Sequence, residues 1–418
     1  MSNADIVVVG AGAAGLFAAI HAARGAPHAR VVAIDSAKSL GAKILVAGGG
    51  RCNVTHREVS EGDYCGSSSP LIRRVLRQYC VAETIAFFAQ HGVALKEEST
   101  GKLFPTTDKA RTVLDALLSA AASSGVTIQN PCRVESIVRP KDDAHSFEVC
   151  TASGPLTAKR VIVATGGMSL PKSGSDGSGY ALAKALGHSM TPMVVPALVP
   201  LTLPDGHWLR TLSGLALDAR VQVVPPASQR TKVAEGPVLC THFGLSGPAI
   251  LDISRHWVFA HEADSSSTLR VNWLPRFTPE SLDEQLLASR GQSLLAAMRG
   301  LLPDRFLREL CAQTGVDPSC GVQQIPRTAR VAFVRAATTC EVPISGTRGF
   351  TAAETTAGGI PLHEVDQATM ESLRCPGLHL CGEVLDVDGR IGGFSFQWAW
   401  SSAFVAGTAA AAALTARA

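Results

Sequence analysis

The residues of this chain whose types and spacing point most directly to chemistry are the glycines near its start. The stretch Gly10-Ala11-Gly12-Ala13-Ala14-Gly15 has the spacing G-x-G-x-x-G. In such a loop the first glycine permits a tight turn, the second lets the backbone approach a pyrophosphate, and the third lets a helix pack closely on a strand. Free N–H groups and a partial positive charge at the start of the following helix favour a phosphate there. The motif therefore predicts a dinucleotide site.

The elements around this loop have the order that such a site requires. Residues 4–9 form an apolar run that predicts a buried strand, residues 13–24 predict a helix, and residues 30–35 predict a second strand. Asp35 ends that strand, 20 residues beyond Gly15, where an acid accepts hydrogen bonds from ribose hydroxyls. The β-turn-α-β order predicts an α/β fold with a doubly wound parallel sheet.

A second glycine-bearing helix start lies near the other end of the chain. An expected strand ends at Gly382-Glu383, and the pair Gly392-Gly393 opens an expected C-terminal helix. A nicotinamide-only enzyme has no need for this feature, whereas the flavin end of FAD must be held by a second set of loops. The helix start would stabilise negative charge on a reduced flavin, and Glu383 and Asp386 would accept hydrogen bonds from ribityl hydroxyls. The two glycine motifs together predict FAD.

The rest of the chain divides into parts with different expected secondary structure. Helical spacing recurs over residues 70–90 and 108–124, residues 39–56 read as a glycine-rich loop, and short strands are expected at 126–128, 134–138, 147–151, 156–159 and 161–164. From about residue 190 the chain becomes β-rich up to residue 278 and then helical over 279–320. An alternation of expected strands and helices resumes near residue 346. The pattern therefore predicts an insert within one domain.

These motifs carry a resemblance to a known family. The signatures are Gly41 to Asn53, Ala164 to Gly167, Pro171 to Tyr180, Thr241 to Pro248, and Cys381 to Gly389 with Gly392-Gly393. The chain resembles the HI-0933-like bacterial flavoproteins, which include proteins similar to aminoacetone oxidase and bile-acid reductase. The resemblance implies a glutathione-reductase-type FAD-binding fold formed by residues 1–189 and 346–418. It also implies an inserted substrate domain, 190–345, with β-barrel-like and helical parts.

The resemblance further implies that the loop from Gly41 to Asn53 wraps the FAD. Its expected cofactor contacts are Lys43, Gly49, Gly50, Arg51, Cys52 and Asn53. The other cofactor contacts expected beyond the two glycine motifs are Ser36, Val134, Thr165, Gly166, Gly167, Gly382 and Phe394. Cys52 reads as a small neighbour of the flavin and not as a redox thiol, because the loop holds no second cysteine.

The sequence does not identify the catalytic residues. His242 could act as a proton donor or base near the flavin, because the unperturbed pKa of histidine is about 6.5, or it could cap a turn. Asp176 is expected to cap a helix that begins near Gly179. The histidines and the 11 cysteines show no metal-binding spacing, so no metal is expected, and the scattered cysteines suit a reducing cytoplasm.

Composition narrows the possible partners. The hydrophobic fraction of 46% and charged fraction of 17% suit a large core, and the net charge of +3 comes without a dense basic run. A nucleic-acid partner is therefore not expected, and no segment has the length and apolarity of a membrane span. The oligomeric state is left open.

Three schemes for electron flow remain possible, because the chain has only one G-x-G-x-x-G and no evident nicotinamide domain. NAD(P)H could dock transiently and supply hydride for an organic substrate, which is the scheme we favour. An amine could instead reduce the flavin, with O2 as the acceptor, or electrons could pass to another protein. Competing functions are a tRNA-associated flavoprotein and a non-catalytic FAD-binding protein.

Overall fold

The computed structural model describes residues 2–140, 146–224 and 231–415. The chain folds into two compact units, one made of Met1–Pro196 with Phe350–Ala418 and the other of Ala197–Gly349. We call them unit 1 and unit 2. Both unit boundaries lie a few residues later than those expected from the sequence.

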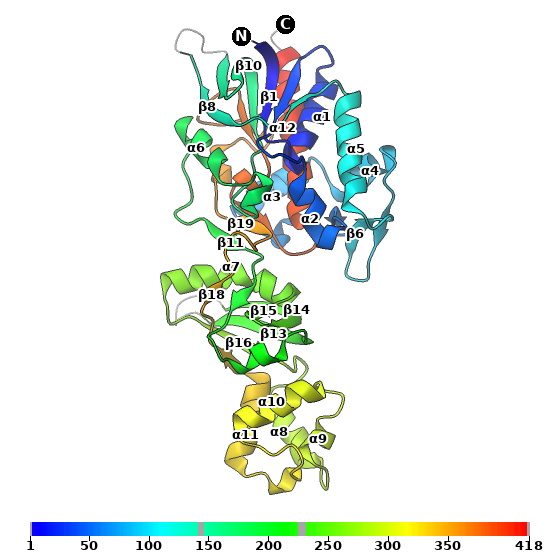
Figure 1. The fold of residues 1–418 in the computed structure, drawn as a ribbon, viewed down its shortest axis with the longest axis vertical. Coiled ribbons are helices and arrows are strands. Elements are labelled where there is room, and N and C mark those ends of the chain that lie inside the picture. Colours follow the sequence, from blue (N-terminus) through cyan, green and yellow to red (C-terminus); the bar gives the residue numbers. More distant parts are fainter. Residues whose placement is uncertain (1, 141–145, 225–230, 416–418) are drawn as a thin grey trace. The chain divides into compact units, whose positions relative to one another are not determined.

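Unit 1 is built on a seven-stranded sheet whose centre is parallel (Figure 1). Strand β1 (Ser2–Val9) pairs in parallel with β2 (Val31–Ile34) on one side and with β10 (Gly154–Val163) on the other. The sheet has the order β7-β2-β1-β10-β9-β8, and β20 (Leu378–Leu380) also pairs with β10. The apolar runs at 6–9 and 31–34 are buried, as strands covered on both faces require. The predicted doubly wound α/β fold is confirmed.

Strand β10 corrects one detail of the sequence analysis. Residues 156–159 and 161–164 were expected to form two separate strands, but one ten-residue strand that ends at Val163 runs through both ranges. Its first half pairs antiparallel with β9 (Phe147–Thr151), which in turn pairs with β8 (Val134–Val138), so the expected meander is present. Its second half pairs in parallel with β20. One strand thus joins the meander to the parallel core.

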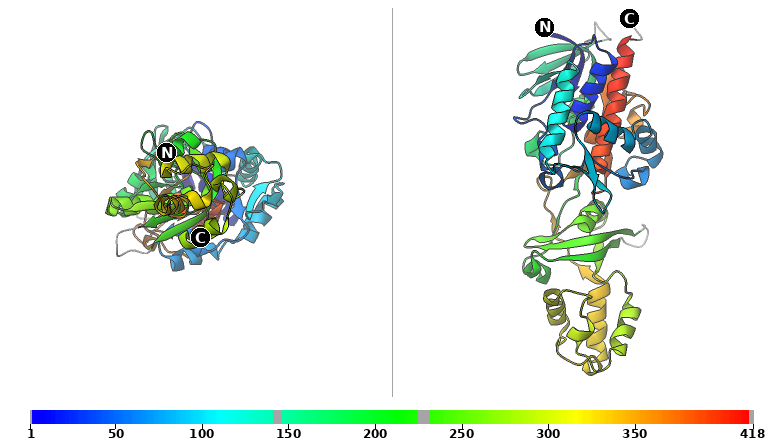
Figure 2. Two further views of the ribbon diagram at one scale, coloured as in Figure 1. Left: turned by 90° about the horizontal axis from the view of Figure 1, so that it is seen from below. Right: turned by 90° about the vertical axis from the view of Figure 1, so that its right-hand side faces the viewer.

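Helices α1 (Ala13–Gly25) and α12 (Phe394–Thr415) lie side by side in unit 1 (Figure 2). The ring of Phe17 contacts that of Trp400, and a Cβ on Gly25 would lie 2.9 Å from Cβ of Ala411. The two helices therefore run in the same direction, and both glycine-bearing starts lie at one end of the pair. Residues 416–418 of the expected C-terminal helix lie outside the described residues.

The expected loop at 39–56 contains a short helix, α2 (Ala42–Gly50), which has a kink at Ala47. Residues 42–46 favour a helix, and Ile44 is buried, whereas the glycines that follow have positive φ angles. The expected helix at 70–90 is two helices, α3 (Ser69–Leu76) and α4 (Val81–Gln90).

The remaining elements of unit 1 connect these parts. They are β3 (Thr55–His56), β4 (Tyr64–Gly66), β5 (Leu95–Glu97), β6 (Lys102–Pro105), α5 (Ala110–Ser123), β7 (Thr127–Gln129), α6 (Ser178–Ala185), β19 (Thr355–Ala357) and β21 (Val387–Gly389). Strand β11 (Val195–Ala197) lies at the boundary between the two units in sequence.

Unit 2 contains an antiparallel sheet with the order β17-β16-β13-β14-β15-β12-β18. The strands are β12 (Leu201–Thr202), β13 (Ala216–Val224), β14 (Lys232–Thr241), β15 (Gly244–Ser246), β16 (Thr268–Asn272), β17 (Cys340–Val342) and β18 (Gly346–Thr347). Helix α7 (Pro248–Ala263) packs on β13 and β14 within the stretch expected to be β-rich.

The helical part of unit 2 extends beyond the residues 279–320 expected from the sequence. It comprises α8 (Pro279–Ala288), α9 (Leu294–Ala297), α10 (Asp304–Thr314) and α11 (Arg327–Thr338). Helix α11 begins directly after Pro326 and packs on α8 and α10. In the described part of the chain, no helix has both the length and the apolarity needed to cross a membrane.

Candidate functional site

The glycine turn after β1 is held by close backbone contacts. Gly10 has a φ of 99°, and a Cβ placed on it would lie 2.5 Å from the carbonyl oxygen of Ala164. A Cβ on Gly15 would overlap the carbonyl oxygen of Gly10. Side chains at these two positions would therefore push α1 away from β1 and β10, which is the packing reason for the first and third glycines of the motif.

Gly12 differs from its neighbours because a Cβ placed on it would meet nothing within 4 Å. It precedes the first turn of α1, and no side chain caps that helix. Asp35 Oδ2 accepts a hydrogen bond from the backbone N–H of Ala11 at 2.6 Å, and Oδ1 accepts one from Ala37 at 2.7 Å. Open space therefore lies before uncapped N–H groups, which fits a pyrophosphate.

Two further segments meet the end of β2. The N–H of Cys132 donates to the carbonyl oxygen of Asp35, so the chain entering β8 at Val134 lies beside it. A Cβ on Gly174 would lie 3.7 Å from Oγ of Ser36. The structure thus brings Ser36 and the 132–134 segment to the expected ribose end of the site.

The loop after Thr165 supplies another close contact. Gly166 has a φ of 74°, and its Cβ would lie 2.7 Å from Oγ of Ser175. The Ser175 hydroxyl is buried and has no hydrogen-bond partner among the described residues. Asp176 accepts a hydrogen bond from the N–H of Ser178 at 3.0 Å, and its carboxylate also binds Arg133. Asp176 therefore accepts a hydrogen bond from the first residue of α6, although it is not the N-cap residue. Gly177 occupies the N-cap position.

The glycine triplet of the 41–53 loop lies open. Gly48, Gly49 and Gly50 are exposed and have positive φ angles, and a Cβ on Gly49 would meet nothing within 4 Å. A planar ligand could approach this backbone closely. Arg51, in contrast, is held by the protein itself, because its guanidinium lies 4.1 Å above the ring of Phe104 and 2.6 Å from Oε1 of Glu98.

The start of α12 offers polar atoms without partners. A Cβ on Gly393, whose φ is 94°, would lie 2.6 Å from the carbonyl carbon of Thr55 and 2.9 Å from Oδ1 of Asn53. Asn53 Oδ1 and the Ser395 hydroxyl are buried, and neither has a hydrogen-bond partner in the described part of the chain. Such atoms fit the polar edge of a flavin. The next residue, Phe394, stacks on His56 at 4.8 Å.

Glu383 belongs to a hydrogen-bonded cluster that the sequence did not reveal in full. Its Oε2 lies 2.7 Å from Nζ of Lys43, and its Oε1 accepts from the Ser169 hydroxyl at 2.9 Å and the N–H of Thr356 at 3.0 Å. Lys43 and Glu383 were expected cofactor contacts, whereas Ser169 and Thr356 were not singled out. Their positions, shortly after Gly167 and shortly before the pair Gly358-Gly359, were the available signals.

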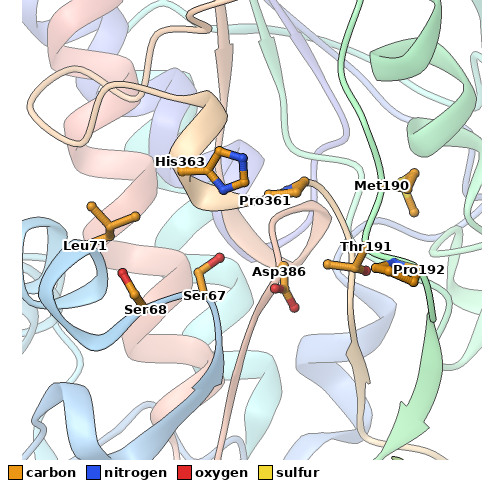
Figure 3. Close-up of a pocket in the computed structure, with 9 residues that line it drawn as sticks. All are labelled: Ser67, Ser68, Leu71, Met190, Thr191, Pro192, Pro361, His363 and Asp386. Atoms are coloured by element: carbon orange, nitrogen blue, oxygen red, sulfur yellow. The ribbon is translucent and has the colours of Figure 1, made fainter.

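Asp386 lines a cavity of about 350 Å³ in unit 1 (Figure 3). The lining residues come from the start of α3, the segment after α6, the segment after β19 and the residue before β21, and are Ser67, Ser68, Leu71, Met190, Thr191, Pro192, Pro361, His363 and Asp386. The Ser67 hydroxyl oxygen accepts from the N–H of Leu362, and Asp386 is buried. Among these residues, only Asp386 was expected from the sequence to contact the cofactor.

Cys52 is fully buried and has a φ of 61°. Burial raises the pKa of its thiol to about 12, so the thiolate that redox chemistry needs is scarce at neutral pH. This geometry fits the interpretation of Cys52 as a neighbour of the site without redox function.

We therefore predict that iodoacetamide at pH 8 leaves Cys52 unmodified in the folded protein while it alkylates Cys80, which is exposed. Peptide mass spectrometry after a short reaction measures both sites in one sample. Unfolding in urea should make both cysteines react, which serves as the control. Rapid alkylation of Cys52 in the native protein would contradict the prediction.

His242 lies in unit 2, in the turn between β14 and β15. Its carbonyl oxygen accepts a hydrogen bond from Nε of Arg210 at 2.8 Å, and its side chain is exposed. Its role as a proton donor stays a prediction. Among the described residues, no group of three His, Cys, Asp or Glu side chains is placed to hold a metal ion.

Curated relatives cover nearly the whole chain. A ribosomal RNA dihydrouridine synthase of Escherichia coli (strain K12) is 34% identical over 407 residues, which are 97% of this chain and 97% of the relative. A 3-dehydro-bile acid delta(4,6)-reductase of Clostridium scindens is 34% identical over 412 residues, which are 97% of this chain and 98% of the relative.

Solved structures share the fold at low identity. A 3-ketosteroid delta1-dehydrogenase from Sterolibacterium denitrificans aligns with a TM-score of 0.53 at 14% identity and covers 99% of this chain and 100% of its own. The FrdA subunit of E. coli quinol fumarate reductase aligns with a TM-score of 0.51 at 17% identity, covering 100% of this chain and 72% of its own.

The family model described as the HI0933-like protein Rossmann domain matches residues 4–409. This match and the two relatives confirm the resemblance drawn from the glycine motifs. The chain belongs to the HI0933-like family of FAD-dependent oxidoreductases.

Proposed function

We propose that this protein uses FAD to reduce a carbon–carbon double bond conjugated with a carbonyl group, with transiently docking NAD(P)H as the electron donor. The observation that carries the proposal is that two relatives, both 34% identical, have names that point to the same kind of bond. Making dihydrouridine saturates a ring double bond conjugated with a carbonyl of uracil. A delta(4,6)-reductase acting on a 3-dehydro bile acid saturates double bonds conjugated with a ketone.

The chain supplies binding and orientation for this chemistry. The start of α1 at Gly12 would hold the pyrophosphate, Asp35 the ribose, and the start of α12 at Gly393 the flavin. When bound, FAD supplies hydride transfer at its N5 atom. The overall reaction consumes one NAD(P)H and one proton, and converts one C=C bond into a CH–CH bond.

The charge of unit 2 favours a small organic substrate over RNA. This unit carries 15 Arg and Lys residues against 13 Asp and Glu, so its net charge is small. RNA binding usually draws on a concentrated basic surface, because phosphates dominate the affinity.

The cavity beside Asp386, which lies in unit 1, also suits a small organic molecule. Its volume of about 350 Å³ lies within the size range of small-molecule sites.

The test is an anaerobic stopped-flow experiment on the purified holoprotein. NADPH or NADH should bleach the visible absorbance of the flavin, and a 3-keto-4,6-diene steroid should restore it without oxygen, with one NAD(P)H consumed per double bond. The corresponding saturated ketone, which lacks the double bond, is the matched control and should restore nothing.

Other outcomes point to other functions. Bleaching by an amine and recovery only with O2 would favour an amine oxidase. Recovery with a uridine-containing RNA and not with the diene would favour RNA as the substrate. Absence of bleaching by any donor would overturn the proposal and favour a non-catalytic FAD-binding protein.

A further inference from the structure

We infer that Lys43 and Glu383 shift the reduction potential of the bound FAD in opposite directions, with Lys43 facing the cofactor and Glu383 both orienting Lys43 and offsetting its charge. This inference rests on the FAD site of the proposed function. It does not depend on which substrate is reduced.

The pair is held in one arrangement by buried partners. Nζ of Lys43 donates to Oε2 of Glu383 and to Oγ of Ser169, both at 2.7 Å. The Ser169 hydroxyl donates to Oε1 of Glu383 at 2.9 Å, which closes a three-membered ring of hydrogen bonds. Ser169 and Thr356 are almost fully buried, so the groups that fix the carboxylate cannot move far.

Thr356 ties this ring to the loop that follows Gly167. Its N–H donates to Oε1 of Glu383, while its hydroxyl oxygen accepts from the N–H of Met168 at 2.8 Å and of Ser169 at 3.1 Å. Both oxygens of Glu383 are therefore occupied by protein donors. Because its carboxylate is already satisfied, we assign Glu383 the tasks of orienting Lys43 and offsetting its charge, in place of a purely direct role at the ribityl chain.

Lys43 keeps one N–H for a ligand. An ammonium group has three donors, and the described residues accept from two of them. The side chains of Lys43 and Glu383 are 26% and 17% exposed, so the pair is accessible from solvent. A partly desolvated charge with an unused donor is able to interact with a bound anion or carbonyl.

The position of the pair points to FAD as that ligand. A Cβ on Gly167 would lie 2.8 Å from Oε1 of Glu383, and a Cβ on Gly382 would lie 2.8 Å from Cβ of Ala14 in the first turn of α1. The pair thus lies where the 165–167 loop, the start of α1 and the 382–383 turn converge. All three segments were predicted to contact the cofactor.

The two charges act on the flavin with opposite signs. Two-electron reduction of a flavin adds negative charge, which a nearby ammonium group stabilises and a nearby carboxylate opposes. In the intact pair the two effects largely cancel. Removing one charge leaves the other uncompensated, so the two single substitutions should move the potential in opposite directions.

This opposition gives a sharp test with the variants Lys43→Met and Glu383→Gln. Each is purified with FAD and equilibrated anaerobically with a dye of known potential. We expect Lys43→Met to lower the ratio of reduced to oxidised FAD about tenfold at a fixed potential, which is a shift of about −30 mV for two electrons. We expect Glu383→Gln to raise that ratio about tenfold, and the double variant to return near the wild-type value.

A purely structural role makes a different prediction. Both single variants break the same ion pair, so a structural effect would move both potentials in the same direction, and that result would overturn the inference. Lys159→Met is the matched control, because it breaks the exposed Lys159–Asp5 pair elsewhere in unit 1 and should leave the potential unchanged.

The outcomes also separate this inference from the proposed function. If the wild-type protein retains no FAD, the proposed function fails. If it retains FAD and reduces the diene but the shifts share one sign or vanish, only the present inference fails. Should Lys43→Met lose FAD, the sign for Glu383→Gln decides alone: an upward shift supports the inference, and any other result overturns it.

Discussion

Replacing Gly12 with Asp is expected to abolish FAD retention while leaving the apoprotein at least as stable as the wild type. A Cβ placed on Gly12 would meet no protein atom within 4 Å, so the fold has room for a side chain to begin there. Asp is a better N-cap residue than Gly by roughly a few tenths of a kcal/mol, so the substitution should not weaken the helix start. The same carboxylate would occupy the place expected for the pyrophosphate and repel it, so we expect the affinity for FAD to fall more than about 1,000-fold, or about 4 kcal/mol.

The measurement combines FAD titration of the apoprotein with its thermal unfolding. Gly12→Asn, which has nearly the same size without the charge, separates repulsion from bulk. Gly15→Ala is the contrasting variant: its Cβ would overlap the Gly10 carbonyl, so it should lower the apoprotein's melting temperature. A Gly12→Asp protein that stays yellow and binds FAD normally would show that the pyrophosphate lies elsewhere.

The features that sequence could predict are those set by local pattern. The apolar run at residues 6–9 and the glycines at 10, 12 and 15 define a strand, a turn and a helix within one short segment, because each residue acts on its own neighbours. The open space at Gly12 and the close packing at Gly15 agree with the roles derived for the motif. The family, the α/β class and FAD followed from this short-range information.

The features that sequence missed depend on contacts between distant segments. Ser169 and Thr356 have no unusual neighbours, and their importance arises only because β10 and β19 bring them to Lys43 and Glu383. Helix α2 was hidden for a related reason: three glycines dominate the composition of its segment, yet burial of Ile44 stabilises the turn before them. Tertiary packing overrides local propensity in such cases.

A buried cluster around Glu364 also depends on contacts between distant segments, so the sequence did not reveal it. Its loss is expected to lower the stability of unit 1. Glu364 accepts hydrogen bonds from Nδ1 of His188 at 2.9 Å and from the N–H and hydroxyl of Ser189, and Nε2 of His188 lies 2.8 Å from the Ser372 hydroxyl. Burial lowers the pKa of His188. Its two ring nitrogens contact different groups, Nδ1 the carboxylate of Glu364 and Nε2 the hydroxyl of Ser372. Through His188, the cluster joins the segment after α6 to Glu364 and to Ser372.

Replacing Glu364 with Gln is expected to destabilise unit 1 by about 3 kcal/mol at neutral pH. Burial by itself would raise the pKa of Glu364, but hydrogen bonds from Ser189 and His188 outweigh it and lower the pKa from 4.5 to about 2. At about 1.4 kcal/mol per pKa unit, this difference is worth about 3 kcal/mol wherever the unfolded carboxylate is ionised. A depressed carboxyl pKa stabilises above pH 4.5, and that stability is lost as the pH falls towards 2.

The test is urea unfolding of the wild type and of Glu364→Gln at several pH values between 7 and 3. The gap between their free energies of unfolding should be largest near neutral pH and shrink below pH 4.5, because the carboxyl group of the unfolded wild type then binds a proton that the native state takes up only near pH 2. Glu58→Gln is the control: its side chain is 82% exposed, so its effect should stay within about 0.5 kcal/mol at every pH. A gap that does not change with pH would mean that Glu364 acts through shape and hydrogen bonding, with no contribution from its charge.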